Sequence, residues 1–511
     1  DDEATLAMLR RGESIGVFQL EGGPMRALMR SLAPTSFDDI AALVALYRPG
    51  PMGANMHNDY ADRKNGRKPV EYLHPDLEET LGDTYGLMIY QESVMRVAQK
   101  VAGYSLAEAD NLRKACGKKI REMIRAERDK FVAGCETTGY GRDLGDKLFD
   151  IIEPFADYAF NKSHAYGYGL IAYQTAWLKA HYPVEYLAAL LTSVKDSQDK
   201  AAIYLAECRT MGIEVRVPDI NLSVSKFTAV PPVPPEEGET PAGTLGSIPF
   251  GLSAVRNVGE GVTDLILAER EAGGDFVDFY DFCERVDTAA LNKRTVEALI
   301  KSGAFDLLGH TRKGLLAAYE RIIDLTVAKR KQHDMGAMSL FDSLGDDGPV
   351  FDDRPRIEDG ELDKKVKLAF EKEMLGLYIS DHPLMGVESA LRRRTDGTVD
   401  EILGGEEETV CSIGGVVTGL QRKWTKRGDL MAVFQLEDLR GSLEVMVFPK
   451  TMTEHGHKLE DDAIVIVRGR VDRKEDTVRV MAMELERFEP VADSPSVLID
   501  LTRSAVNDDL L

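Results

Sequence analysis

Residues 157–191 read DYAFNKSHAYGYGLIAYQTAWLKAHYPVEYLAALL and place a lysine, a serine and a histidine where a helix is expected to begin. Asn161 or Ser163 can cap that helix by accepting a hydrogen bond from a backbone N–H of its first turn. The unpaired N–H groups and the helix dipole favour an anion at this end. Lys162 and His164 add donors at the same place, so the stretch predicts a phosphate site.

Composition predicts a multi-domain, cytoplasmic protein. At roughly 150 residues per domain, 511 residues correspond to three or four domains. There is no apolar run of the ~18 residues that span a bilayer, so no membrane partner is expected. The five cysteines are scattered, and His455 and His457 have no third ligand nearby in the sequence. We therefore expect neither disulfides nor a metal site, and place the two histidines in a loop.

Charge is unevenly distributed along the chain. The net charge is −23, from 63 basic and 86 acidic residues. The segment from Asn111 to Lys130, however, contains eight basic residues and only three acidic ones. A local patch of this kind can bind phosphate on an acidic protein.

The fold class predicted is multi-domain, with mainly α-helical regions followed by a β-barrel. A capping box at Ser105 and Glu108 begins one amphipathic helix of the first region. Strands are expected where β-branched residues alternate with polar ones, and their number and spacing fit a five-stranded OB barrel. They are Val410–Leu420, Leu430–Glu437, Ser442–Phe448, Ala463–Val471 and Thr477–Phe488.

Several motifs in the first 120 residues, together with the opening stretch, resemble the fingers domain of the bacterial DnaE-type DNA polymerase III alpha subunit, a replicative family. They are Tyr47–Met52 (YRPGPM), His74–Pro75, Thr84–Gly86, Tyr90–Glu92 and Leu112–Lys119 (LRKACGKK), in the order of that family. The likeness extends to about residue 490 and implies a DNA-directed DNA polymerase, a nucleotidyltransferase active in chromosome replication. Together with the composition of the connecting segments, the likeness gives the following expected modules: 1–229 fingers; 230–247 a Pro/Gly-rich linker; 248–332 a helix-hairpin-helix region; 333–365 an acidic connector; 366–408 a helical connector; 409–490 an OB-fold domain; and 491–511 a tail.

The family's catalytic aspartates lie in a palm domain ahead of the fingers, and no Asp-x-Asp on a hydrophobic strand occurs here. The chain also begins at Asp1 rather than at a methionine. We therefore expect a C-terminal portion that starts at the fingers and contains no catalytic residue. Mg²⁺ is expected for the complete polymerase, with its ligands outside this chain. Alone, the chain is not expected to extend a primer.

The resemblance assigns incoming dNTP to two segments, around 113–119 and 161–168. Arginine suits phosphate through its planar fork, and lysine acts as a mobile point charge. His164 either donates a hydrogen bond or protonates the departing pyrophosphate, and Tyr168, on the same helix face, either stacks on the nucleotide or packs in the core. The candidates are Arg113, Lys114, Lys118, Lys119, Lys162, His164 and Tyr168.

Primer-template DNA is expected at four further places. Arg48 either contacts DNA or caps a helix, and Arg121 lies in the basic segment. Two hairpins are expected, Leu252–Arg270 hinged at residues 258–261 and Leu291–Phe305 hinged at residues 302–304. Their candidate DNA contacts are Gly259 and Gly261. Glycines there would let backbone N–H groups reach a phosphate; the alternative is an ordinary helical hairpin with glycine at its C-cap.

The fourth place is the loop expected between the first two strands. One aromatic stands among four cations at Arg422, Lys423, Trp424, Lys426 and Arg427. This composition suits stacking on single-stranded bases. In the alternative, Trp424 folds back on the barrel.

A sliding-clamp-binding motif is implied at Ala337–Phe341 (AMSLF), where Met338, Leu340 and Phe341 would fill an apolar groove. Ala337 stands where the family usually has glutamine. The alternative is that these residues hold the connector to the domain surface. Expected partners are thus primer-template DNA, dNTP, a sliding clamp and clamp-loader subunits.

Three other functions compete with this interpretation. One is the error-prone paralogue of the same family, and another is a non-catalytic helix-hairpin-helix and OB adaptor. A DNA glycosylase would need a lysine where Gly261 stands, followed by an aspartate near Asp278. Without the amine no Schiff base forms, so we expect Asp278 to cap the next helix.

Overall fold

The computed structural model describes residues 1–117, 121–155, 160–195, 197–232, 245–334, 354–405, 409–425, 428–474 and 477–489, apart from a few side chains beside the gaps. The chain divides into two compact units, Asp1–Leu187 and Ala188–Leu511. The module bounds expected from the sequence stay predictions. Among the described residues, none of the helices has the length and apolarity needed to cross a bilayer.

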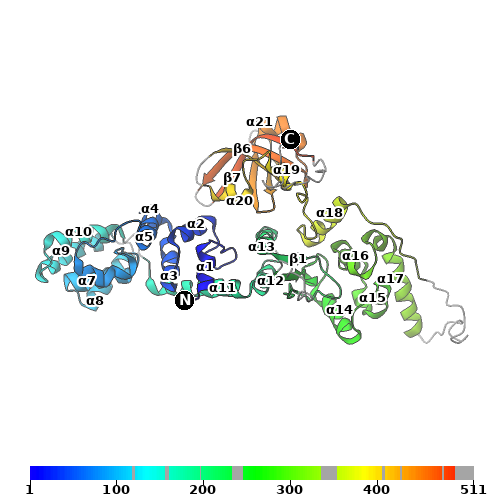
Figure 1. Ribbon diagram of the computed structural model, residues 1–511, viewed down its shortest axis with the longest axis horizontal. Helices are drawn as coiled ribbons and strands as arrows, with labels where there is room; N and C mark the ends of the chain where they lie inside the picture. Colours follow the sequence, from blue (N-terminus) through cyan, green and yellow to red (C-terminus); the bar gives the residue numbers. More distant parts are fainter. Residues whose placement is uncertain are drawn as a thin grey trace, which may run out of the picture. The chain divides into compact units, whose positions relative to one another are not determined.

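The first unit is built from helices (Figure 1). They are α1 (Glu3–Arg10), α2 (Gly23–Leu32), α3 (Phe37–Leu46), α4 (Pro49–Gly53), α5 (Met56–Lys64), α6 (Glu78–Leu81), α7 (Gln91–Ala102), α8 (Leu106–Gly117), α9 (Arg121–Thr137), α10 (Arg142–Phe155) and α11 (Lys162–His181), with α12 (Pro183–Ser193) crossing the boundary. The capping box predicted ahead of α8 is confirmed, because the Ser105 N–H donates to the Glu108 carboxylate at 2.9 Å and the Glu108 N–H to the Ser105 hydroxyl at 3.4 Å.

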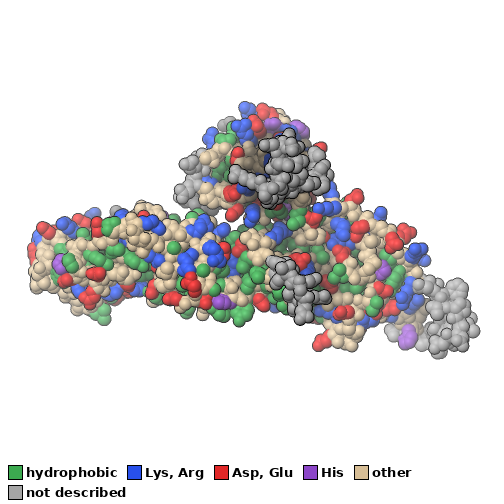
Figure 2. Space-filling view, in the orientation of Figure 1, with side chains coloured by type: hydrophobic (Ala, Val, Ile, Leu, Met, Phe, Trp, Pro, Cys, Tyr) green, Lys and Arg blue, Asp and Glu red, His purple; other side chains and the backbone are tan. Residues whose placement is uncertain are grey.

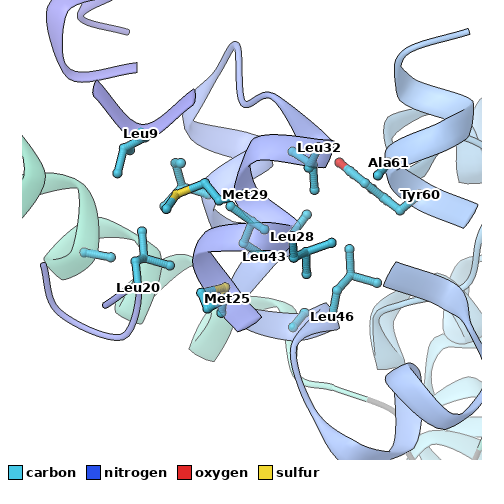
Figure 3. Packing of buried hydrophobic residues seen from close by; sticks show 14 of the residues in the cluster. Leu9, Leu20, Met25, Leu28, Met29, Leu32, Leu43, Leu46, Tyr60 and Ala61 are labelled. Carbon is cyan, nitrogen blue, oxygen red and sulfur yellow. The ribbon is translucent and has the colours of Figure 1, made fainter. Parts of the chain in front are cut away.

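Two hydrophobic cores hold this unit together. One is formed by α7 to α10. The other gathers α1, α2, α3, α5 and α11, with Leu28, Leu43 and Leu46 at its centre (Figure 3). Helix α3 is buried nearly all round, as its apolar sequence requires.

Helix α11 is fixed at two points along its length. Gly169 packs so closely on α3 that a Cβ atom there would lie 3.2 Å from the Ala41 Cα. Lys179 is fully buried, and its ammonium donates to the carbonyls of Glu13 and Ile15 at 2.9 and 2.8 Å. These contacts place the N-terminus of α11, where the phosphate site is predicted.

The second unit begins with α13 (Gln198–Thr210) and a parallel pair of short strands, β1 (Ile213–Arg216) and β2 (Gly246–Pro249). The sequence did not predict this pair; β2 includes Gly246 and Ser247, which were expected in the linker. Helices follow: α14 (Glu260–Gly273), α15 (Phe279–Arg285), α16 (Lys293–Ser302), α17 (Arg312–Asp334), α18 (Lys364–Leu375), α19 (Glu388–Arg392) and α20 (Val399–Gly404).

The chain then forms a closed barrel of five described strands in the order β3-β4-β5-β7-β6, with α21 (Pro449–His455) between β5 and β6. The strands are β3 (Val410–Trp424), β4 (Leu430–Glu437), β5 (Ser442–Val447), β6 (Ile464–Lys474) and β7 (Thr477–Arg487). The predicted fold class, helices followed by a β-barrel, is confirmed. The prediction that His455 lies in a loop was wrong, because that residue is the last of α21.

Candidate nucleotide and nucleic-acid sites

The N-terminus of α11 is capped as the sequence predicted. The Asn161 side chain accepts a hydrogen bond from the His164 N–H at 2.8 Å, and the Ser163 hydroxyl donates to the same oxygen at 2.6 Å. Asn161 is therefore the cap, and Ser163 supports it. This geometry leaves His164 exposed on the first turn.

A carboxylate already lies at this helix start, which the sequence did not predict. The Lys162 N–H donates to Glu92 Oε2 at 2.8 Å, and the Asn161 amide donates to Glu92 Oε1 at 3.1 Å. Glu92 is in the first turn of α7, about 70 residues away in the chain. The anion-binding character of the α11 N-terminus is thus satisfied internally by a carboxylate.

The two segments predicted to hold a nucleotide both reach the first turn of α7. Arg113 of α8 lies 3.5 Å from the Gln91 amide oxygen, and the next residue, Glu92, holds Asn161 and Lys162. The Gln91 N–H also donates to the Phe160 carbonyl at 2.9 Å. Arg113 and Lys162 therefore share one local environment, although 48 intervening residues separate them in the sequence.

Acidic side chains partner the described lysines and the arginine of this site. Lys162 pairs with Asp83 at 2.8 Å, and Arg113 and Lys114 both pair with Asp110 at 2.8 Å. These two cations hold the pKa of Asp110 below its usual range, the hydrogen bond from Lys114 contributing most. Basic and acidic side chains are likewise interspersed over the visible face in Figure 2.

Arg48 joins the site through an aromatic contact. Its guanidinium carbon lies 4.0 Å from the centre of the Phe160 ring, and its pKa is lowered by burial. The Arg48 backbone is the N-cap of α4, without a hydrogen bond from the side chain to that helix. The side chain is thus left to stack on Phe160.

Three further rings continue from Phe160. The ring centres of Phe160 and His164 are 5.4 Å apart, those of His164 and Tyr168 are 4.2 Å apart, and Phe18 follows 5.5 Å beyond Tyr168. The shared face of His164 and Tyr168 is therefore observed as a stacked pair. We name Arg48, Phe160, His164 and Tyr168 the aromatic row.

Some predicted residues lie outside the described part. Lys118 and Lys119 are among them, and so is the Arg121 side chain, although its backbone begins α9. The clamp-binding residues Met338, Leu340 and Phe341, with Ala337, also lie outside, as do Lys426 and Arg427. Their assigned roles stay predictions.

The helix-hairpin-helix region differs from the expected pattern at its first hairpin. The prediction of an α-helix ahead of the hinge was wrong, because only a 3₁₀ turn at Leu252–Ala254 precedes it. Helix α14 begins directly after Gly259, which is its N-cap. A Cβ atom at Gly259 or Gly261 would meet nothing within 4 Å, and neither glycine has a positive φ. Internal crowding and backbone strain therefore do not account for these two glycines.

The second hinge has the conventional geometry of a helix end. Gly303 is the C-cap of α16, with φ +91°, a left-handed conformation suited to glycine. Asp278 caps α15 by accepting from the Asp281 N–H at 2.8 Å. Its predicted capping role is confirmed.

The basic hairpin of the barrel presents its tryptophan to solvent. Strand β3 continues to Trp424, which pairs with Leu430 of β4, so the expected start of the loop at Gln421 was wrong. Trp424 is 73 % exposed, which contradicts the alternative that it folds back on the barrel. Of its described neighbours, Lys423 is exposed, whereas Arg422 donates to the Leu459 carbonyl at 3.0 Å.

Comparison with protein families finds three matching models. Residues 1–139 match the bacterial DNA polymerase III alpha subunit finger domain, residues 212–315 a helix-hairpin-helix motif, and residues 411–488 an OB-fold nucleic acid binding domain. These matches fall on the first helical unit, the hairpin region and the barrel.

Several proteins similar to this chain share the same name. The chain is 48 % identical to a DNA polymerase III subunit alpha of Mycobacterium tuberculosis, covering 95 % of this chain and 40 % of that protein. The protein of that name from Thermus aquaticus is 41 % identical, over 98 % of this chain and 39 % of that protein. The one from Pseudomonas aeruginosa is 36 % identical, over 100 % of this chain and 44 % of that protein. The chain thus spans about two-fifths of the length of the curated relatives it matches.

Proposed function

We propose that this chain is the fingers, helix-hairpin-helix and OB portion of a replicative DNA-directed DNA polymerase of the DnaE type. The similarity to polymerase III alpha subunits along nearly the whole chain supports this proposal. In the complete enzyme it would bind the incoming dNTP and the primer-template, while groups outside this chain make the phosphodiester bond.

The observation that carries the nucleotide part of the proposal is the approach of Arg113 and Lys162 to consecutive residues of α7. Arg113 contacts Gln91, and Lys162 contacts Glu92. A triphosphate carries about four negative charges and attracts a cation more strongly than a single carboxylate does. We infer that the triphosphate takes Lys162 from Asp83 and Arg113 from Asp110.

The aromatic row would contact the rest of the nucleotide. His164 is exposed and can donate a hydrogen bond, while the rings of His164 and Tyr168 offer a stacked apolar surface for a sugar or base. Arg48 on Phe160 adds a guanidinium whose charge has been partly desolvated, which strengthens its attraction to phosphate.

A divalent metal is expected for nucleotidyl transfer, but the described residues do not fit one. They contain no group of three or more histidine, cysteine, aspartate or glutamate side chains that could hold an ion. We therefore assign no metal-dependent step to this chain. Its own residues would bind and orient the nucleotide.

The two later modules would hold DNA. The open space at Gly259 and Gly261 suits a duplex phosphate reaching the backbone of the hinge, and exposed Trp424 suits stacking on the unpaired template strand. A sliding clamp at Met338, Leu340 and Phe341 stays part of the proposal on the sequence alone.

The test compares two lysines in matched settings. Lys162 and Lys68 each pair with an aspartate at 2.8 Å, but Lys68 follows the end of α5 and its partner, Asp59, lies in that helix. Loss of a hydrogen bond to a charged group costs ~1.5–3 kcal/mol, so Lys162→Ala should weaken dNTP binding about 10- to 150-fold and Lys68→Ala should not. Equilibrium dialysis with labelled dNTP measures this, and fluorescence anisotropy with a primer-template measures DNA binding in parallel.

Unchanged dNTP affinity in Lys162→Ala would contradict the nucleotide assignment. A loss confined to primer-template binding would reassign Lys162 to DNA.

A further inference from the structure

A second basic site lies beside the first hairpin of the helix-hairpin-helix region. It is a pocket of about 310 Å³, which we name the arginine pocket, lined by Arg256, Asn257, Arg294, Glu297, Ala298, Lys301, Glu373 and Met374. Arg256 precedes the hinge glycines, and Arg294 is in the first turn of α16. None of these residues was singled out by the sequence.

The charges of the arginine pocket are partly neutralised from within. Lys301 pairs with Glu297 at 2.9 Å and with Glu373 at 3.6 Å, so one lysine engages both lining carboxylates. Arg256 and Arg294 are exposed and form no ion pair with any described residue. Two guanidinium groups thus remain in one small concave site on a strongly acidic chain.

The loop that carries Arg256 is held in place by its neighbours. The Arg256 N–H donates to the Met374 carbonyl at 2.8 Å, and the Thr295 hydroxyl donates to the Asn257 carbonyl at 3.1 Å. Asn257 has φ +67°, a left-handed conformation that turns the chain toward the hinge. Val258 is then buried, so the backbone of this loop is ordered before any ligand binds.

Helix α16 fixes the region of the second arginine. The Asn292 side chain accepts from the Arg294 N–H at 2.9 Å and so caps the helix. The neighbouring Lys293 is instead engaged by Asp324 at 2.9 Å and Glu320 at 3.4 Å. Lys293 and Arg294 are adjacent on the same helix, but they differ in their partners. Lys293 is paired with carboxylates, whereas Arg294 lines the pocket without a carboxylate partner among the described residues.

We propose that the arginine pocket binds a backbone phosphate of duplex DNA, next to the phosphate contacted by the Gly259–Gly261 turn. The planar guanidinium fork matches the two free oxygens of a phosphodiester, and two forks from different elements can hold one phosphate from two sides. Contacts of this kind fix the position of the protein on the duplex without reading its sequence. The inference rests on the proposed function, of which it names a DNA-contacting site.

Salt dependence of duplex binding tests the proposal. Each phosphate neutralised contributes roughly 0.9 to the slope of log K against log salt concentration. Arg256→Ala and Arg294→Ala, each made in the full chain, should reduce the magnitude of that slope and weaken the binding of a blunt duplex. In the double variant the slope should fall in magnitude by about the contribution of one phosphate. Lys293→Ala is the matched control and should leave the slope unchanged.

Arg256→Lys separates charge from geometry. It should keep the slope but lower the affinity, because an ammonium lacks the fork. Unaltered slope and affinity in the arginine double variant, with a native circular dichroism spectrum, would overturn the proposal. If instead the unmodified chain bound no duplex at all, the DNA-binding part of the proposed function would fail.

The same chemistry could serve a free nucleotide. Titration with dNTP and with inorganic phosphate, at constant ionic strength, distinguishes the sources. A dNTP affinity lost in the arginine double variant while duplex binding stays intact would overturn the DNA assignment. We expect the affinity for dNTP to stay unchanged in that variant.

Discussion

Glu92 occupies the start of α11 by accepting a hydrogen bond from the Lys162 backbone N–H at 2.8 Å. The helix end that would attract a phosphate therefore has a carboxylate of its own. This contact orders the helix start in the absence of a nucleotide, and it also places a negative charge next to the proposed triphosphate.

Replacing Glu92 with glutamine should tighten dNTP binding. The amide oxygen can still accept from the Lys162 N–H, whereas the amide NH2 cannot accept from Asn161, so one hydrogen bond is lost together with the competing negative charge. A charge at a helix terminus is worth ~0.3–1 kcal/mol, so affinity should rise about two- to fivefold. Equilibrium dialysis measures the change, with Glu79→Gln as a control because Glu79 pairs with Lys100 elsewhere. Weaker binding in Glu92→Gln would mean that the carboxylate assists the nucleotide.

Trp424→Ala should weaken binding of a single-stranded oligonucleotide such as oligo-dT. Stacking of one base on an aromatic ring is worth ~1–3 kcal/mol, which corresponds to about 5- to 150-fold in affinity. The chain has one other tryptophan, Trp177 in α11, whose ring centre lies 4.6 Å from that of His181 in a tilted arrangement. Trp177→Ala should bind as the unmodified chain does in fluorescence anisotropy. Equal oligonucleotide affinities for the unmodified chain, Trp424→Ala and Trp177→Ala would contradict a stacking role for Trp424.

Arg312→Met should destabilise the region around α17 and α18. The Arg312 side chain is buried and pairs with Asp306 at 2.7 Å and with fully buried Glu371 at 3.0 Å. Removing one partner leaves a buried charge uncompensated, which costs ~3–5 kcal/mol. Hydrogen exchange of peptides from both helices should report an opening free energy lower by about that amount.

The control for Arg312 is an exposed pair of the same chemistry. Arg392 and Glu401 also lie 3.0 Å apart, but both are about half exposed. Arg392→Met should leave local stability nearly unchanged, because water screens an exposed ion pair. Similar losses in both variants would show that burial is not the cause.

His382 should make the second unit less stable in acid. Burial lowers its pKa to about 3 from an ordinary 6.5, with the charges of Arg209 and Lys372 acting in the same direction and Asp381 opposing them. Because the unfolded state takes up the proton first, the contribution of His382 is complete above pH 6.5. It is lost at up to ~1.4 kcal/mol per pH unit as the pH falls toward 3.

His382→Asn removes this titration. The Leu384 N–H donates to His382 Nδ1 at 3.1 Å, and an asparagine oxygen can accept that bond instead. The midpoint of thermal unfolding should therefore fall less between pH 6.5 and 4 in His382→Asn than in the unmodified chain. His457→Asn, at an exposed histidine, should follow the unmodified chain. Parallel pH profiles for all three proteins would exclude His382 as the acid-sensitive group.

Local signals carried most of the correct predictions. Asn161 as a cap and Ser105 with Glu108 follow from patterns within four residues, and the barrel strands follow from alternation along each strand. Strand β3 is longer than predicted because its hairpin continues the ladder to Trp424 beyond the apolar residues.

Contacts between distant parts of the chain could not be predicted from such patterns. Strands β1 and β2 are four residues each and acquire strand structure by pairing with one another across the intervening linker. Glu92 at the start of α11 and Arg48 on Phe160 likewise depend on how the helices pack. The same reason kept Arg256 and Arg294 from being recognised, because their proximity is created by the loop bonded to Met374 and Thr295.

The central claim is that Arg113 and Lys162 act on one triphosphate, and a double-mutant cycle on dNTP affinity tests it directly. Arg113→Ala, Lys162→Ala and the double variant should show a coupling energy of ~0.5–3 kcal/mol, because two groups that bind the same ligand site are not independent. Two losses that add without coupling, or no loss in one of the single variants, would contradict the claim that both residues bind the same triphosphate.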